Sequence, residues 1–198
     1  ITWNPGSPEF SIVATPVLNV PYIGNLPNSP LGGNNVARLQ DTQLSNGPMT
    51  RISTQFPVTN ANTLFQFAFA GSWDGAHLCC EQASLRIDLY NCTGSLVLLP
   101  CANLTLTPGS GQCVGTSGYS LTGTVSWTNW QVKYIDLTPY IGQCIRLVVT
   151  TSDCTYSGHH GSLWFDALCG GQLIGQGLGG VGGFVPGAVS FCAGSNQA

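Results

Sequence analysis

The sequence predicts an all-β fold, a β-sandwich, on three observations. Short runs rich in β-branched and aromatic residues alternate apolar with polar positions, which is the period of a half-buried strand. Turn-forming residues separate these runs about every 8–12 residues, a spacing typical of sandwiches. No segment combines a helical apolar period with helix caps. A chain of 198 residues is long enough for one such sandwich with extensions.

The first 34 residues are expected to form an extended arm. Prolines at positions 5, 8, 16, 21, 27 and 30 exclude a helix there, because proline breaks the helical hydrogen-bond ladder. Residues 11–20 are expected to form an edge strand, and the rest of residues 1–34 is expected to be arm or loop. The sandwich is expected to span residues 35–169, and residues 170–198 are expected to form a Gly-rich, apolar tail.

Three phenylalanines mark the clearest strand, residues 64–70. Phe65, Phe67 and Phe69 occupy alternate positions, so their side chains share one face of an extended chain. Buried sheets use this pattern more often than exposed ones do, and we expect the three rings in the core. An aromatic platform for a sugar is the alternative.

Further strands are expected on both sides of this one. Their ranges are 35–40, 50–58, 85–90, 95–100, 130–135, 145–150 and 162–168. Residues 71–82 and 102–126 are expected to be long loops, the second one polar and variable. A corner is expected at residues 139–142, because Pro139 fixes its φ and Gly142 permits a positive one.

Motifs in residues 127–169 resemble a known family. The chain reads Trp-Thr-Asn-Trp, Ile-Asp-Leu, Tyr-Ile-Gly-Gln, Gly-His-His-Gly and Trp-Phe-Asp-Ala in this order. This order resembles the jelly-roll β-sandwich domain of large secreted adhesin-like proteins of Bacteroidetes-type bacteria, which is distantly similar to MAM and galactose-binding-like domains. With residues 33–39 and 65–70 the resemblance covers roughly residues 15–170. It implies a jelly-roll strand order and secretion, and it leaves the ligand open because such sandwiches host many functions.

Charged residues are scarce in this chain. They make up 7% of it, with a net charge of −3, whereas an average protein has about 25%. The chain has no excess of basic residues, which argues against binding to nucleic acid. A surface with so few charges suits a protein that lies outside the cell or is covered by other protein. No apolar run is long enough to suggest insertion into a membrane, and Ile at position 1 suggests a mature chain without its signal peptide.

Nine cysteines indicate disulfides in an oxidising compartment, because no pair has the spacing of a zinc ribbon. Cys92 with Cys101 and Cys144 with Cys154 are local candidate pairs, and other connectivities stay open. Eight cysteines are expected to pair completely within the sandwich: Cys79, Cys80, Cys92, Cys101, Cys113, Cys144, Cys154 and Cys169. The adjacent Cys79 and Cys80 are expected to have different partners, because their side chains point to opposite sides of an extended chain.

The ninth cysteine, Cys192, lies in the tail among the apolar residues Leu173, Ile174, Phe184 and Val185. An ordered Gly-rich segment has to be docked, because glycine loses more backbone entropy on ordering than any other residue. We expect the tail to contact a neighbouring subunit. Cys192 is then bonded to that subunit or buried where the tail docks.

Calcium is the metal that the resemblance implies, because related jelly rolls often hold a structural Ca²⁺ between an early strand and the last one. Asp166 stands at the matching place, with Asp41, Asp74 or Glu81 as candidate partners. Oxygen ligands of this kind suit Ca²⁺. The alternative is that Asp166 accepts hydrogen bonds from neighbouring backbone N–H groups, and no cofactor is then required.

His159, His160 and Asp153 are the candidates for acid–base chemistry. No Gly-x-Ser-x-Gly nucleophile motif accompanies them. The eight acidic residues also include no evident pair for glycoside hydrolysis. The two histidines are better explained as part of a turn in which their side chains cap loop carbonyls. We therefore expect a protein that is not an enzyme.

The leading hypothesis is a non-catalytic structural or adhesive module of an extracellular assembly at the cell surface. The arm and the tail could each add a strand to the sheet edge of a neighbouring copy. Such a contact is head-to-tail and can propagate into a filament of identical subunits.

The alternative is a carbohydrate-binding module of a larger secreted protein, with surface glycans as its partners. This function needs exposed aromatic rings beside polar groups on a concave face or a loop rim. The candidate rings are those of Trp73, Trp127, Trp130, Tyr119 and Tyr156. Burial of the indoles would remove this support.

Overall fold

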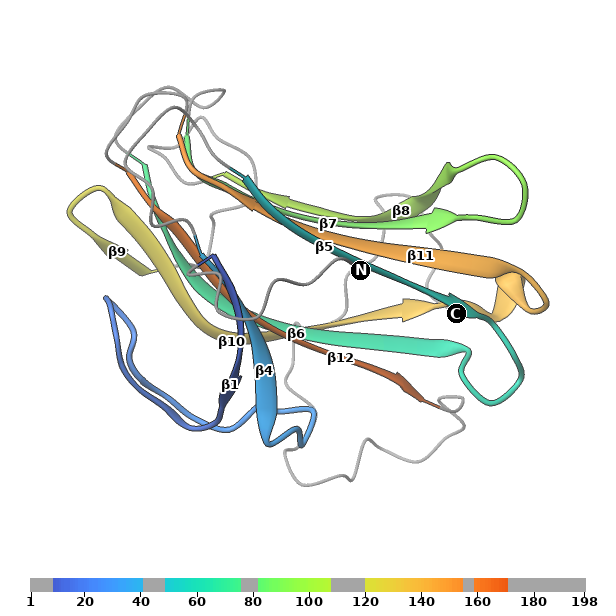
Figure 1. Ribbon diagram of the computed structural model, residues 1–198, viewed down its shortest axis with the longest axis horizontal. Helices are drawn as coiled ribbons and strands as arrows, with labels where there is room; N and C mark the ends of the chain where they lie inside the picture. The colour runs from blue at the N-terminus through green and yellow to red at the C-terminus, as the bar shows by residue number, and fades with distance from the viewer. Residues whose placement is uncertain (1–8, 41–48, 76–81, 108–119, 155–158, 171–198) are drawn as a thin grey trace.

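The computed structural model describes residues 9–40, 49–75, 82–107, 120–154 and 159–170. In these residues the chain forms two antiparallel sheets that pack face to face, accompanied by a short two-stranded sheet (Figure 1). The one helical element in the described ranges is a 3-10 turn, η2 (Thr138–Tyr140), at the predicted corner. Gly142 has a φ of 82° there, the positive value that this corner requires. No helix of the described part is long and apolar enough to cross a membrane.

The strands divide between three sheets. In spatial order, the six-stranded sheet contains β1 (Phe10–Ala14), β4 (Asn35–Gln40), β12 (Gly161–Gly170), β6 (Leu64–Asp74), β10 (Val125–Asp136) and β9 (Ser120–Thr122). The four-stranded sheet contains β5 (Met49–Pro57), β11 (Cys144–Ser152), β7 (Ser84–Asn91) and β8 (Val97–Leu106). The two-stranded sheet is the hairpin of β2 (Val17–Val20) and β3 (Gly24–Leu26).

The strand order is that of a jelly roll. From β4 onward the chain alternates between the two large sheets, except for the connections β7–β8 and β9–β10, each of which stays within one sheet. As a result, the order β4-β12-β6-β10 in one sheet faces the order β5-β11-β7-β8 in the other. This is the arrangement of two Greek keys in eight strands, and the predicted fold class is confirmed.

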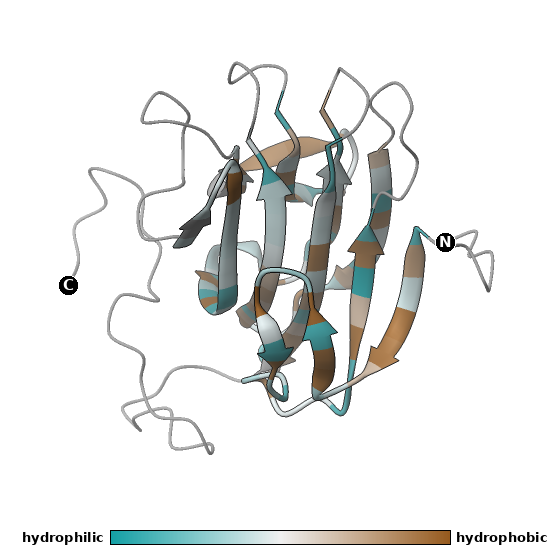
Figure 2. Cartoon of the chain, turned by 90° about the vertical axis from the view of Figure 1, so that its left-hand side faces the viewer, coloured by the Kyte–Doolittle hydropathy of each residue, from teal (hydrophilic) through white to brown (hydrophobic). Residues whose placement is uncertain are grey.

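Period-two alternation places the core between the sheets. Phe65, Phe67 and Phe69 on β6 are almost completely buried and belong to one cluster with Ile87 of β7 and Leu147 of β11. Figure 2 shows apolar and polar segments alternating along the strands. The three rings are therefore core residues, as predicted, and they offer no platform to a sugar.

The predicted loop at residues 71–82 was placed wrongly at its start, because β6 continues to Asp74. Trp73 is therefore a core residue with an exposed fraction of 2%. Its ring lies over Gly71, where an added Cβ would stand 2.5 Å from the ring and 2.4 Å from the carbonyl oxygen of Ser162. Residues 102–126 were also expected to be a loop, yet β8 extends to Leu106 and β10 begins at Val125.

A second, smaller core lies on the outer face of the six-stranded sheet. Trp164 of β12 points outward, because its neighbours Leu163 and Phe165 both belong to the main core. Its cluster also contains Val20, Leu26, Val36 and Ala70, so the β2–β3 hairpin covers this part of the sheet.

The N-terminal segment is joined to the six-stranded sheet from β1 onward. Strand β1 pairs with β4 at the sheet edge. The expected edge strand of residues 11–20 ends at Ala14, because Pro16 has no N–H group to continue the ladder. The chain then continues into the hairpin that covers Trp164.

Candidate binding groove

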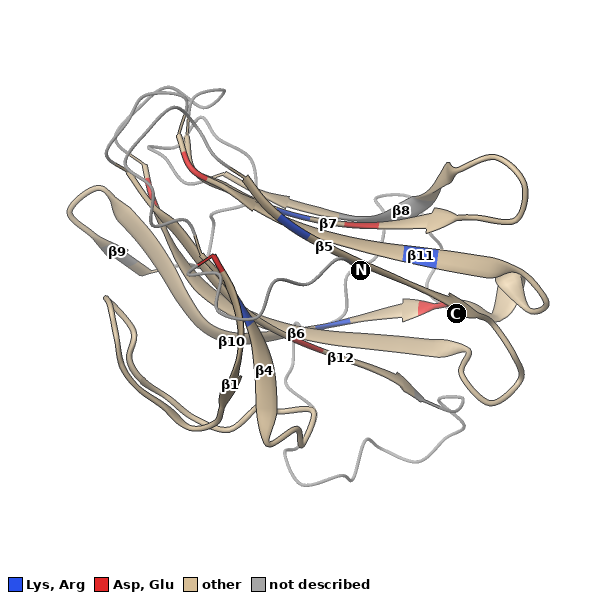
Figure 3. Ribbon diagram, in the orientation of Figure 1, with Lys and Arg blue, Asp and Glu red and all other residues tan. Residues whose placement is uncertain are grey.

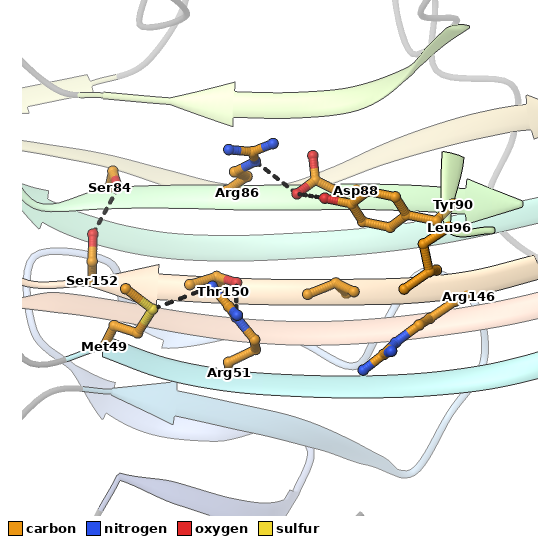
Figure 4. Close-up of a pocket in the computed structure, with 11 residues that line it drawn as sticks. Met49, Arg51, Ser84, Arg86, Asp88, Tyr90, Leu96, Arg146, Thr150 and Ser152 are labelled. Atoms are coloured by element: carbon orange, nitrogen blue, oxygen red, sulfur yellow. Dashed lines mark hydrogen bonds and ion pairs between the residues drawn. The ribbon is translucent and has the colours of Figure 1, made fainter. Parts of the chain in front are cut away.

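The outer face of the four-stranded sheet carries a groove of about 490 Å³ (Figure 4). Strands β5, β11 and β7 supply most of its lining, and one residue comes from the β7–β8 connection. The lining residues are Met49, Arg51, Ser84, Arg86, Asp88, Tyr90, Leu96, Arg146, Val148, Thr150 and Ser152.

The groove is hollow because small side chains stand on the central strand and long ones on its neighbours. On β11 the core takes Leu147 and Val149, so Val148, Thr150 and Ser152 face outward and form the floor. The flanking strands raise walls with Met49 and Arg51 on one side and with Arg86 and Tyr90 on the other. The short side chains on β11 and the longer ones on β5 and β7 therefore form a groove on the solvent side of the sheet.

The strand register sets the spacing of the three arginines. Thr150 pairs with Arg51 on β5 and with Arg86 on β7, so the two arginines flank one threonine. Their Cα atoms are two strand spacings apart, about 10 Å. Arg146 pairs with Tyr90 and stands four residues along β11 from Thr150, which is about 13 Å. Figure 4 shows Arg51 and Arg86 on opposite sides of Thr150.

Arg86 has an acidic partner in the groove. Its Nε donates to Asp88 Oδ2 at 2.6 Å. The hydrogen bond and charge of Asp88 raise the pKa of Arg86. Arg86 is therefore fully cationic and held at the wall.

Within the described residues, Arg51 and Arg146 bond to neutral groups. Arg51 donates from Nε to Thr150 Oγ1 at 3.2 Å and from Nη2 to Met49 Sδ at 3.4 Å. Arg146 donates from Nη2 to Ser53 Oγ at 3.3 Å. Among the described residues neither guanidinium forms a salt bridge.

The carboxylate of Asp88 is only half satisfied. Its side chain is 4% exposed. Asp88 Oδ2 accepts from Arg86 and, at 3.4 Å, from the hydroxyl of Tyr90. Asp88 Oδ1 is buried and receives no donor within the described residues. A buried carboxylate oxygen without a donor is rare, because it has lost water and gained nothing in return.

Positive charge is concentrated in this groove. Of the five basic residues in the chain, three line it, and of the described acidic residues only Asp88 does. Figure 3 shows basic segments on β5, β7 and β11. The remaining two, Arg38 and Lys133, stand on β4 and β10 of the other large sheet. A chain with a net charge of −3 therefore presents a locally cationic surface.

A disulfide joins β7 to β11 at the end of these strands nearest Tyr90 and Arg146. Cys92, directly after β7, bonds to Cys144 at the start of β11. The predicted local pairs Cys92–Cys101 and Cys144–Cys154 are therefore wrong. The reason is topological: β7 and β11 are neighbours in the sheet, so their ends meet although 52 residues separate them in the chain.

The other cysteines are only partly described. Cys154 is buried, with its Sγ 3.4 Å from His159 Nδ1. Cys169 is half-buried, burial raises its pKa, and it has no disulfide within the described residues, so the complete pairing of the eight cysteines stays a prediction. The remaining cysteines and the tail lie outside the described residues. They are Cys79, Cys80, Cys113, Cys192, the side chain of Cys101, and the tail residues Leu173, Ile174, Phe184 and Val185.

The aromatic candidates for sugar binding do not meet in the groove. Trp73 is in the core, which removes it from the set. Trp127 and Trp130 are half-buried on β10, where Trp127 Nε1 donates to Thr122 Oγ1 at 3.0 Å and Trp130 Nε1 donates to the carbonyl of Pro27 at 2.9 Å. Tyr119 and Tyr156 lie outside the described residues.

The two described candidates for calcium lie far apart. Asp166 pairs in register with Ala68, six residues from Asp74 on β6, which is about 20 Å. Asp166 accepts from Ser29 Oγ at 2.5 Å and from the N–H of Ala167 at 2.9 Å. Asp74 and Asp166 therefore cannot share one ion. The described residues hold no cluster of three His, Cys, Asp or Glu side chains fit for a metal, and Asp41 and Glu81 lie outside them.

The two histidines contact side chains at the entry to β12. The ring of His160 stacks on Tyr22 of the hairpin connection, with centroids 5.7 Å apart. His159 Nε2 lies 3.9 Å from Asp74 Oδ2. Asp153 Oδ1 accepts from the N–H of Cys154 at 2.6 Å, and burial raises the pKa of Asp153.

The groove itself was missed at the sequence level. Its signal is that three expected strands, 50–58, 85–90 and 145–150, each carry one arginine. Alternation places Arg51 on the opposite face from Ile52 and Phe56, but the sequence does not say that these strands are neighbours.

The comparisons with known proteins find similar solved structures but no family. No family model and no curated protein matches the chain. A similar solved structure is that of TmCBM61 in complex with beta-1,4-galactotriose, with 12% identity, a TM-score of 0.41 and coverage of 81% of this chain and 82% of that chain. The strand order described above establishes the jelly roll by itself.

Proposed function

We propose that this chain is a non-catalytic carbohydrate-binding module and that the groove on the four-stranded sheet is its binding site. The observation that carries the proposal is a hollow surface lined by hydrogen-bonding side chains, over a central strand, β11, that is paired on both sides. Hydroxyls of Ser84, Thr150 and Ser152 and the phenol of Tyr90 can each donate and accept. A ligand covered with hydroxyls matches such a lining better than an apolar one does.

Two further features support a binding role without catalysis. Among the described residues, Asp88 is the single carboxylate in the groove, and glycoside hydrolysis commonly needs two. The Cys92–Cys144 disulfide favours an oxidising environment, so we place the module outside the cell.

The filament interpretation gains no comparable observation. It depends on the apolar tail and Cys192, which lie outside the described residues. Contact with copies of the same chain therefore stays a prediction.

A groove-filling variant tests the proposed site. Val148→Trp puts a large ring on the floor of the groove without entering the core, since Val148 faces outward. Val132→Trp, on β10 of the other sheet, is the matched control. Affinity electrophoresis against a panel of neutral, carboxylated and sulfated polysaccharides should show retardation of the wild type and of Val132→Trp, and loss of it in Val148→Trp.

Two results would contradict the proposal. If the wild type is retarded by none of these polysaccharides, the chain is not a carbohydrate-binding module. If Val148→Trp binds as well as the wild type while remaining folded, the binding site lies elsewhere.

A further inference from the structure

The three arginines of the groove restrict the class of ligand. We infer that the groove binds an acidic saccharide, one that carries carboxylate or sulfate groups, with Arg51, Arg86 and Arg146 as the anion contacts. This inference rests on the proposed function and names the ligand class of the same site.

The placement of the charges is the first argument. Arginine has a planar fork of donors that fits carboxylate and sulfate-like oxyanions. Arg51 and Arg146 bond only to a threonine, a serine and a thioether, so their charges have no salt-bridge partner in the described part. Two uncompensated cations in one groove of a net acidic chain indicate an anionic ligand.

The separation of the charges is the second argument. Arg51 and Arg86 flank Thr150, and Arg146 stands about 13 Å farther along β11. One small anion cannot contact both places at once. An elongated chain with repeated acidic groups can, as in an oligosaccharide of uronic acids or of sulfated sugars.

The third argument is that one oxygen of the Asp88 carboxylate can accept a hydrogen bond from a ligand hydroxyl. Its Oδ1 has no donor within the described residues, and Asp88 belongs to the lining of the groove. A hydroxylated ligand in the groove supplies the missing donor to Asp88, with Arg86 keeping its bond to Oδ2. Inorganic sulfate has no hydroxyl group to donate to Asp88. An acidic sugar carries both an anionic group for the arginines and hydroxyl groups for Asp88.

An acidic peptide is less favoured by the same surface. A peptide that binds by adding a strand needs a free sheet edge. The groove lies on the face of the sheet, where β11 is already paired on both sides with β5 and β7. Only side chains are offered there.

The test compares ligands that differ only in charge. Isothermal titration with an oligogalacturonate and with its methyl ester isolates the carboxylate, and dextran sulfate with dextran isolates the sulfate. Poly-glutamate serves as the peptide probe. We expect at least one acidic saccharide to bind about tenfold or more tightly than its neutral partner, with affinity that falls as salt rises.

Arginine variants locate the contact. Arg51→Gln and Arg146→Gln should each lower affinity for the acidic form about tenfold, because a charged hydrogen bond is lost. Affinity for the neutral form should stay within about twofold. Lys133→Gln, outside the groove, removes the same charge and should change neither.

The failures are distinguishable. Equal binding of acidic and neutral forms overturns the inference and leaves the carbohydrate module standing. Equal losses in Lys133→Gln and Arg51→Gln, or binding of poly-glutamate as tight as that of the saccharides, also overturn it. If no saccharide of either kind binds, the inference and the proposed function fall together.

Discussion

The two large sheets each turn one face to the common core, and their outer faces have opposite characters. On the six-stranded sheet, Trp164 and Ala70 lie under the β2–β3 hairpin with Val20 and Leu26. On the four-stranded sheet, Thr150 is 9% exposed and lies on the floor of the groove between two flanking arginines. One outer face has become a second core, and the other has remained a surface on which a ligand can bind.

The difference shows how one jelly roll can have a covered outer face and an open outer face. Both faces are built by the same alternation of side chains. A large apolar residue at an outward position, such as Trp164, requires a cover. A small polar residue at the equivalent position, such as Thr150, leaves a hollow if its neighbours are long. Side-chain size at outward positions therefore decides which face is covered and which stays open.

The largest expected effect comes from opening the covered face. Trp164→Ala should lower the free energy of unfolding by about 3–5 kcal/mol, because a buried indole leaves a cavity under the hairpin. The matched truncation on the open face, Val148→Ala, should cost less than about 1 kcal/mol. Urea denaturation of both variants gives the comparison. Similar losses would mean that the two faces do not differ in this way.

The open sheet relies instead on a covalent tie. Replacing both Cys92 and Cys144 by serine should cost about 2–4 kcal/mol, because the unfolded chain loses the constraint of a closed loop. Thermal and urea unfolding under non-reducing conditions measure the effect. A double variant as stable as the wild type would show that the bridge does not stabilise β7 against β11.

A smaller, pH-dependent effect is expected where the chain leaves β11. Burial raises the pKa of Asp153 above the unfolded value of about 3.9. Both states are protonated at lower pH, so stability falls as pH rises through the folded-state pKa and the buried carboxyl ionises. Asp153→Asn lacks this ionisation, and its stability relative to the wild type should increase from about pH 4 to about pH 7.

Urea denaturation of the wild type and of Asp153→Asn at each pH measures the effect. Parallel stability curves for the two proteins would contradict the role of burial at Asp153.

Alternation made much of the fold predictable from the sequence. Phe65, Phe67 and Phe69 were assigned to the core from their spacing alone, and Pro139 with Gly142 marked the corner that η2 occupies. Strand ends were less accurate, as Trp73 shows, because a polar and Gly-containing stretch continues a strand when its neighbours supply the pairing.

The groove could not be predicted in the same way, for a physical reason. Arg51, Arg86 and Arg146 become neighbours only when β5, β11 and β7 pair in one register. That pairing joins segments far apart in the chain, and no local pattern encodes it. The same reason explains the disulfide, where proximity in sequence suggested the wrong partners for Cys92 and Cys144.

The most direct measurement is an NMR titration of the wild type with an oligogalacturonate, followed through the side-chain N–H signals of arginine and tryptophan. The account predicts that the Nε–H signals of Arg51, Arg86 and Arg146 shift with a common dissociation constant while the indole signals of Trp127 and Trp130 stay in place. Shifts confined to the two indoles, with the three arginine signals unchanged, would show that the ligand binds the other sheet and would contradict the account.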